Sequence, residues 1–275
     1  MKALIVGAFL ASAVMGTAAK AQSITTQQAS VGFGTSIDVH VYRPNGAGPF
    51  PLLVISHGSP RRPEARGALG SNTLAAQAKT YMGKGFVVAV PIRRGYGTSS
   101  SNWAEGFGNC QNPDFYAAGL ATAQDIRAAV SSVSADPAVD KNRIVLMGVS
   151  AGGWGSMAAA SLGLPGLKAV VNFAGGRGSQ GPNTVCGGGD ALVAAAGRFG
   201  AGSGGVPQLW VYAANDLFFG PELSRKMHSA FTAAGGQADY VAAPAFGADG
   251  HAYFNAVGSW QGRVDGFLKR SGANR

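Results

Sequence analysis

The sequence predicts an α/β fold in which a mostly parallel, twisted sheet carries helices on both faces of a single domain. Continuous apolar runs recur along the chain, and segments with apolar residues at helical spacing separate them. The 275 residues are 46% hydrophobic, which is enough for a core and excludes wholesale disorder. Only 13% are charged and no heptad pattern runs through the chain, so a coiled coil is excluded as well.

The N-terminal half begins the alternation of strands and helices. Apolar residues at every second position from Ile37 to Val41 predict a half-exposed strand, which we place antiparallel at the sheet edge. The apolar runs 52–56 and 86–90 predict strands buried on both faces. Between them, helical spacing of apolar residues predicts a helix over 74–82, and glycines end it. A long loop is expected from Pro91 to about Pro113.

The C-terminal half continues the same order. Apolar runs predict further strands at 143–147, 167–171, 208–212 and 238–243. Apolar spacing, small residues, or a proline in the first turn predict helices over 114–134, 151–162, 221–234 and 255–269. The glycine-rich segment 197–205 has the composition of a linker, but the strand–helix order resumes after it. We therefore expect a surface loop there, within one domain.

The first 21 residues have the plan of a secretory signal peptide. Lys2 gives a positive start, Ala3 to Met15 form an apolar run, and Ala19-Lys20-Ala21 has small residues at the cleavage positions. The run is shorter than the roughly 20 residues of a membrane span, and an uncleaved anchor is the alternative. We expect residues 22–275 to form a secreted or periplasmic domain with no stable membrane insertion after cleavage.

Export bears on the two cysteines, Cys110 and Cys186. An oxidising compartment favours a disulfide between them, and two free thiols are the alternative. Neither cysteine has metal-like spacing to a histidine or to the other cysteine, and the sequence contains no metal-ligand cluster. We therefore expect a disulfide and no metal.

The charge distribution and the glycine motifs argue against two classes of protein, nucleic-acid binders and nucleotide-cofactor binders. The net charge is +9, but the basic residues are scattered, whereas nucleic-acid binders concentrate them on one element or face. Residues 176–181 match G-x-G-x-x-G, yet Pro182 follows at once, no helix opens, and no acidic residue lies about 20 residues on in a second strand. No Walker-type phosphate loop occurs. We expect neither a nucleic-acid partner nor a cofactor.

The segment Gly148-Val149-Ser150-Ala151-Gly152 matches G-x-S-x-G and lies between a predicted buried strand and a predicted helix. This is the place of a nucleophile elbow, where a sharp, strained turn lifts the serine hydroxyl above the sheet edge. A strand-to-helix turn without catalysis is the alternative. The context favours Ser150 as a catalytic nucleophile.

A serine nucleophile needs a histidine base. Of the four histidines, His40 is expected to be an exposed residue of an early strand, His57 to shape the loop after the first buried strand, and His228 to lie on the solvent face of a helix. His251 follows the last short strand. In the fold expected here that loop returns over the nucleophile, so His251 is the predicted base.

The base needs an orienting acid, for which Asp216 is the first candidate. It follows the strand that ends at Tyr212, and the chain order Ser150, Asp216, His251 is the order of an α/β-hydrolase triad. Asp249 is the main alternative. It lies two residues before His251, a spacing at which the backbone seldom points a carboxylate at the imidazole. Further rivals, without a strand-end position, are Asp190 and Asp239.

An oxyanion hole needs two N–H donors. One is expected from Ala151, directly after the nucleophile. The other is expected from Ser59 in the loop after the first buried strand, because Pro60 has no N–H; Arg61 is the alternative.

These segments carry a family resemblance. His57-Gly58 after one strand, Pro91 to Gly97 after the next, and Gly148 to Gly153 resemble the α/β-hydrolase superfamily over roughly residues 35–270. Within it the chain looks like the dienelactone hydrolase-like and prolyl oligopeptidase catalytic domain-like branch. Dienelactone hydrolases use cysteine where this chain has serine. Prolyl oligopeptidases carry a preceding β-propeller; only about 30 residues lie between the expected cleavage site and the first buried strand, so we expect none here.

The sequence therefore predicts an exported serine hydrolase that cleaves carboxylic esters of a small-molecule acyl substrate through an acyl-enzyme. A serine peptidase acting on short peptides and a non-catalytic binding protein on the same scaffold are the alternatives. We expect Trp103, Phe107 and Tyr116 to flank the substrate cleft, with ordinary packing as the alternative, and we expect Trp154 to be packed in the core. We expect Arg93 and Arg94 to have structural roles, either loop hydrogen bonds or a salt bridge to the helix that carries Asp125; contact with an anionic substrate is the alternative.

Overall fold

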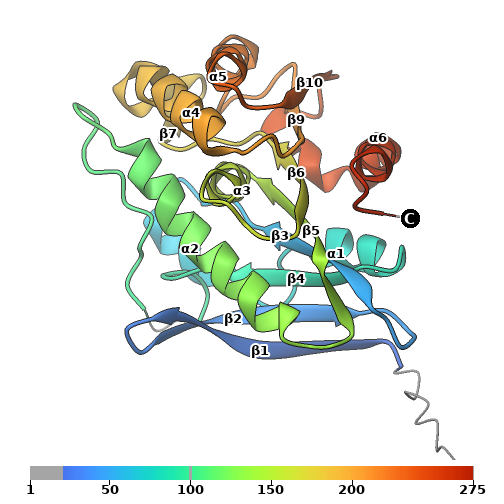
Figure 1. Cartoon of the computed structure of the whole chain (residues 1–275). Coiled ribbons are helices and arrows are strands. Elements are labelled where there is room, and N and C mark those ends of the chain that lie inside the picture. The colour runs from blue at the N-terminus through green and yellow to red at the C-terminus, as the bar shows by residue number, and fades with distance from the viewer. Residues whose placement is uncertain (1–20, 99–100, 275) are drawn as a thin grey trace, which may run out of the picture.

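The structure, a computed structural model, describes residues 21–98 and 101–274; the expected signal segment lies almost wholly outside them. An eight-stranded sheet has the order β1-β2-β4-β3-β5-β6-β9-β10 (Figure 1). Its strands are β1 (Ser23–Gly32), β2 (Thr35–Arg43), β3 (Phe50–Ser56), β4 (Val87–Ile92), β5 (Val139–Val149), β6 (Leu167–Phe173), β9 (Gln208–Ala213) and β10 (Ala238–Ala243). Two short strands, β7 (Ser179–Gly181) and β8 (Thr184–Val185), form a separate pair.

The sheet is parallel from β4 to β10, and β1 and β2 are antiparallel to their neighbours. This confirms the predicted mostly parallel sheet. The prediction that β2 is the edge strand is wrong, because β1 pairs along its outer side. The sequence of β1 is largely polar, and Ala29 is its fully buried residue, so it carries no apolar alternation. The cover that β1 provides also buries His40, which we expected to be exposed and which contacts Thr26 at 2.8 Å.

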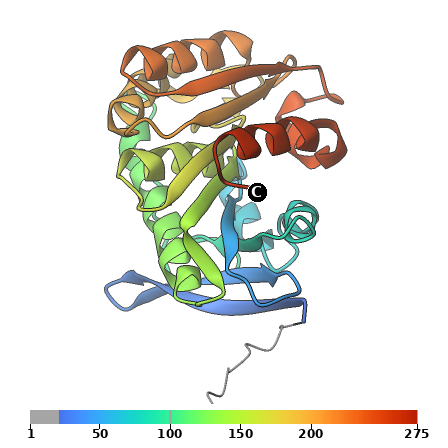
Figure 2. The ribbon, with the colours of Figure 1, turned by 45° about the vertical axis from the view of Figure 1, so that its right-hand side comes forward.

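In the described part of the chain, α-helices cover both faces of the sheet (Figures 1 and 2). They are α1 (Ala75–Met82), α2 (Phe115–Ser134), α3 (Ala151–Ser161), α4 (Asp190–Gly202), α5 (Pro221–Ala233) and α6 (Val257–Arg270). Residues of α2, α3, α4 and α5 share one apolar core, and residues of α1 and α6 share the other. Alternate residues of β3 feed the two cores: Leu52 and Val54 point to the first, Leu53 and Ile55 to the second.

The prediction of a surface loop over 197–205 is wrong for the first part of this segment, which is the end of helix α4. Its glycines allow two helices to approach closely. A Cβ atom at Gly200 would lie 2.1 Å from the backbone oxygen of Phe231 in α5. Glycine here therefore reflects helix packing and not a turn.

Two further features concern the chain as a whole. Cys110 and Cys186 are joined by a disulfide across 76 residues, as the sequence predicts, and this ties the long loop before α2 to the segment before α4. Within the described residues, no helix has the length and apolar character to cross a membrane.

Candidate active site

Ser150 sits at the sharp turn between β5 and α3, with φ 55° and ψ −122°. Left-handed backbone at a non-glycine residue is strained, by roughly 1–3 kcal/mol, and such strain clusters at functional sites. The flanking glycines make the turn possible. A Cβ atom at Gly152 would lie 2.1 Å from the backbone oxygen of Ser56, and one at Gly148 would lie 2.4 Å from the backbone of Gly152. The turn therefore has the geometry of a nucleophile elbow.

His251 and Asp216 lie side by side at the carboxyl ends of neighbouring strands. Asp216 follows β9, and His251 lies in a 3₁₀ helix, Gly250–Asn255, that follows β10. The Nδ1 atom of His251 is 3.1 Å and 3.2 Å from the two carboxylate oxygens of Asp216. Asp216 is 1% exposed, and its Oδ1 accepts hydrogen bonds from the backbone N–H groups of Phe218 (2.7 Å) and Phe219 (2.9 Å). A buried, anchored carboxylate thus faces the imidazole.

The rival acids lie elsewhere. Asp249 Oδ1 accepts from the backbone N–H groups of His251 (2.9 Å) and Leu217 (3.0 Å), so it caps the 3₁₀ helix and links two loops. Asp190 and Asp239 are exposed, on α4 and β10. In this structure Asp216 is the carboxylate that contacts the ring of His251.

The Phe218 ring stacks on the His251 imidazole, with 3.8 Å between ring centroids and 5° between planes. The Cζ atom of Arg61 lies 3.4 Å from the centroid of the same phenyl ring. Two groups so near one ring cannot share a face without clashing, so Arg61 and His251 cover opposite faces. Sequence reasoning missed this stack, because nothing local marks Phe218 as a neighbour of either residue.

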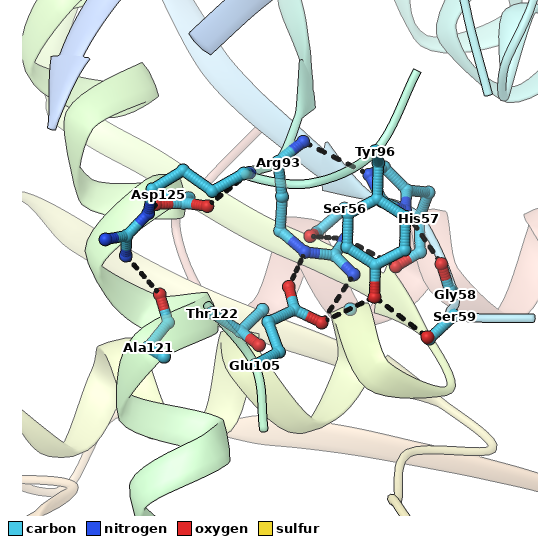
Figure 3. A network of polar contacts seen from close by, with 12 residues as sticks. Ser56, His57, Gly58, Ser59, Arg93, Tyr96, Glu105, Ala121, Thr122 and Asp125 are labelled. Carbon is cyan, nitrogen blue, oxygen red and sulfur yellow. Dashed lines mark hydrogen bonds and ion pairs between the residues drawn. The ribbon is translucent and has the colours of Figure 1, made fainter. Parts of the chain in front are cut away.

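A buried polar network lies beneath the loop that follows β3 (Figure 3). The Arg93 guanidinium, fully buried, forms an ion pair with Glu105 and donates to Ser56 Oγ (3.0 Å) and to the backbone oxygen of His57 (2.6 Å). Glu105 also pairs with Arg177 (2.8 Å). Burial favours the protonated acid, but these two guanidinium groups outweigh it and hold the pKa of Glu105 well below its usual value.

His57 is part of this network rather than of the catalytic set. Its Nδ1 is 2.7 Å from the backbone oxygen of Gly58, and its Nε2 accepts from the backbone N–H of Arg93 (3.3 Å). Burial, together with the positive charge of Arg93, lowers the pKa of His57 to about 3, so the ring stays neutral. This agrees with the loop-shaping role expected for His57.

Ser59, the expected second oxyanion donor, is tied to the same network. The Tyr96 hydroxyl lies 2.8 Å from Ser59 Oγ and 2.8 Å from Glu105 Oε2, and it accepts from Trp103 Nε1 (3.1 Å). The ion pair of Arg94 with Asp125 and the full burial of Trp154 agree with their expected structural roles. Nothing in the sequence pattern marks Glu105 as the centre of this network.

Two pockets meet at Ser150. One, of about 270 Å³, is called here the arginine pocket; it also contains Ala151, and its basic and aromatic residues are Arg61, Arg66, Trp103, Phe107, Arg177, Phe218 and Phe219. The other, of about 450 Å³, is called the apolar pocket; it contains His251, and its apolar residues include Ala65, Leu69, Leu74, Ala252 and Phe254. Ser59, Arg61 and Phe218 border both. Trp103 and Phe107 line the cleft as expected, whereas Tyr116 lines neither pocket and stacks on Phe199, with 5.0 Å between ring centroids.

The fold and this site define the protein as a hydrolase of the α/β-hydrolase type, related to esterases and peptidases. The family model described as X-Pro dipeptidyl-peptidase (S15 family) matches residues 33–197, so the chain belongs to this family. The match includes Ser150 and ends before Asp216. No curated protein sequence matches the chain.

Solved structures show the same fold. A puromycin-hydrolyzing peptidase of Mycobacterium tuberculosis is 17% identical with a TM-score of 0.62, over 90% of this chain and 40% of that one. An acylaminoacyl peptidase of Pyrococcus horikoshii is 17% identical with a TM-score of 0.62, over 93% and 42%. A putative dienelactone hydrolase of Klebsiella pneumoniae is 17% identical with a TM-score of 0.56, over 90% and 97%. The chain thus spans about two fifths of the two peptidases and nearly all of the third protein.

Proposed function

We propose that the protein is an exported serine hydrolase that cleaves carboxylic esters through an acyl-enzyme. The observation that carries this proposal is the contact of His251 with the buried carboxylate of Asp216, in a pocket that Ser150 shares. An imidazole held by a carboxylate, beside a serine on a strained turn, is the arrangement that activates a hydroxyl for attack on an acyl carbon.

The residues then have defined roles. Ser150 Oγ attacks the acyl carbon while its proton passes to Nε2 of His251. Asp216 accepts from Nδ1–H, which fixes the tautomer and stabilises the imidazolium. The backbone N–H groups of Ala151 and Ser59 hold the oxyanion. His251 gives its proton to the departing alkoxide, and a water activated by His251 then releases the acid and frees Ser150.

The family to which the chain belongs suggests a second activity, release of X-Pro dipeptides. Such a substrate places a free N-terminal ammonium on the acyl side of the scissile bond, and an ammonium calls for a carboxylate partner. Among the described residues that line the two pockets, the one carboxylate is Asp249, whose Oδ1 already accepts two backbone N–H groups. The arginines beside Ser150 would repel an ammonium, so an ester substrate fits this site better.

Labelling and turnover test the proposal together. The protein without residues 1–21 is treated with a fluorophosphonate, and its hydrolysis of p-nitrophenyl butyrate is compared with that of Gly-Pro-p-nitroanilide. We expect labelling and ester turnover, both lost in Ser150→Ala, and no anilide turnover. Anilide turnover would favour the dipeptidyl-peptidase. Absence of labelling in the folded protein would favour a non-catalytic binding protein.

Export is tested separately. When the full chain is produced in a secreting bacterial host, we expect the soluble exported product to begin at Gln22, as measured by intact mass. A product that retains residues 1–21 and stays with the membrane would contradict export as a soluble domain and favour an uncleaved anchor.

A further inference from the structure

The arginine pocket carries an excess of positive charge. Arg61, Arg66 and Arg177 line it, and no Asp or Glu does so among the described residues. Neither Arg61 nor Arg66 takes part in any of the ion pairs of the described chain. Their guanidinium groups lie over aromatic rings, 3.4 Å from Phe218 and 3.6 Å from Trp103. Arg61 also donates from Nε (3.1 Å) and Nη2 (2.9 Å) to the hydroxyl of Ser179, which carries no charge. Both charges are therefore unneutralised beside Ser150.

The buried network below this pocket does not cancel the charge. Glu105 is shared between two guanidinium groups, those of Arg93 and Arg177, so one carboxylate faces two cations. The Nε atoms of Arg66 and Arg177 are buried and have no hydrogen-bond partner in the described structure. A guanidinium with unused donors near an aromatic surface favours a planar anion, since a carboxylate can take two parallel N–H donors.

The positions of the catalytic groups assign the two pockets to the two halves of a substrate. His251 lines the apolar pocket and not the arginine pocket, whereas Ala151 lines the arginine pocket alone. A leaving alkoxide departs beside the imidazole that protonates it. The alcohol portion of an ester therefore belongs in the apolar pocket, and the acyl portion belongs in the arginine pocket.

We propose that the substrates are half-esters of dicarboxylic acids, in which the acyl group carries a free carboxylate that Arg61 and Arg66 bind and the alcohol portion is apolar. This rests on the proposed esterase function and names its substrate class. The pocket of about 270 Å³ has room for a ring bearing one carboxylate, because a cavity of roughly 150 Å³ already holds benzene. The aromatic walls formed by Trp103 and Phe107 favour a ring in that place.

A pair of esters of similar size tests whether the enzyme prefers an acyl group that carries a negative charge. Monoethyl terephthalate carries the carboxylate, and ethyl 4-methylbenzoate has a methyl group in its place. We expect kcat/KM to be at least about tenfold higher for the half-ester, a preference that would correspond to about 1.4 kcal/mol. Equal or faster hydrolysis of the neutral ester would overturn the proposal.

Substitutions test which arginines cause the preference for the half-ester. Arg61→Gln and Arg66→Gln are each expected to reduce it at least fivefold, mainly through KM for the half-ester. Arg62→Gln is the matched control, because Arg62 neighbours Arg61 in sequence but lines neither pocket and lies exposed near Glu64. A preference that persists in the Arg61→Gln, Arg66→Gln double variant, folded by circular dichroism, would contradict the assignment.

A binding measurement separates this inference from the proposed function. Ser150→Ala is titrated with both esters by calorimetry, and we expect it to bind the half-ester more tightly, with the difference lost when Arg66→Gln is added. If the wild type cleaves neither ester and resists fluorophosphonate, the proposed function fails, and Arg66-dependent binding of the half-ester would still support the anion pocket. Equal binding of both esters, or binding of neither, would overturn it.

Discussion

The phenyl ring of Phe218 and the imidazole of His251 lie face to face, 3.8 Å apart and within 5° of parallel. The backbone N–H of Phe218 also donates to Asp216, so one residue holds both the ring and the carboxylate that it faces. Arg61 covers the other face of the phenyl ring. The candidate base is therefore positioned by packing as well as by its hydrogen bond to Asp216.

Phe218→Ala should slow turnover more than it weakens substrate binding. Without the phenyl ring the imidazole has additional orientations, and misplacement by about 1 Å is enough to lower turnover on the order of a hundredfold. The measurement is kcat and KM for p-nitrophenyl butyrate, with Phe33→Ala, at an exposed site in the turn between β1 and β2, as control. An unchanged kcat would mean that the hydrogen bond alone holds His251.

Asp216→Asn and Asp249→Asn should differ sharply. An amide in place of Asp216 presents an N–H to the ring and favours the wrong imidazole tautomer, so kcat should fall by about 10²–10⁴-fold. Asn at 249 keeps an oxygen that accepts the N–H groups of Leu217 and His251, and its kcat should stay within about tenfold of the wild type. Steady-state kinetics on the two variants decides this, and the reverse order would make Asp249 the catalytic acid.

The disulfide should stabilise the folded protein, because it closes a long segment of the chain. Cys110 and Cys186 close a loop across 76 residues, and removal of such a crosslink typically costs about 2–5 kcal/mol. Cys110→Ala, Cys186→Ala together should lower the unfolding midpoint in guanidinium chloride. Dithiothreitol should lower the midpoint of the wild type and leave that of the double variant unchanged. Equal sensitivity of both proteins to the reductant would refute this role.

His57 should make the folded protein less stable in acid. Its pKa is about 3 when folded, against 6.5 for an ordinary histidine, so between these pH values the unfolded chain binds a proton that the folded chain does not. The free energy of unfolding should fall as pH drops from 6.5 towards 3, by up to about 1.4 kcal/mol per pH unit from this group. Glu105 has the same sign, because its pKa is lowered on folding and its contribution is lost as pH falls below about 4.5.

Urea unfolding of the wild type and of His57→Gln between pH 4.5 and 6.5 checks this. The two proteins carry the same carboxylates, so the difference in slope between them reports mainly on His57. The variant should be less stable at pH 6.5, where it loses the bond from the N–H of Arg93, but its stability should change less with pH. Parallel slopes would show that His57 is protonated alike in both states.

Local pattern was sufficient for much of the fold. The apolar runs of β3, β4, β5, β6 and β9 mark buried strands, because a strand covered on both faces has no polar alternation. The nucleophile elbow at Ser150 was equally readable, since the glycines that relieve its turn are sequence neighbours. β1 was not readable, because a polar edge strand gains its place from pairing with β2 rather than from its own apolar residues.

The sequence by itself therefore determined the α/β class, the strand that leads into Ser150, and the chain order of Ser150, Asp216 and His251. Only the tertiary structure decided that Phe218 stacks between Arg61 and His251, that Glu105 pairs with Arg177 across 72 positions, and that three arginines line one pocket at Ser150. Strand and turn signals arise from neighbours along the chain. Contacts between loops depend on which strand ends the sheet brings together, and no local periodicity encodes that.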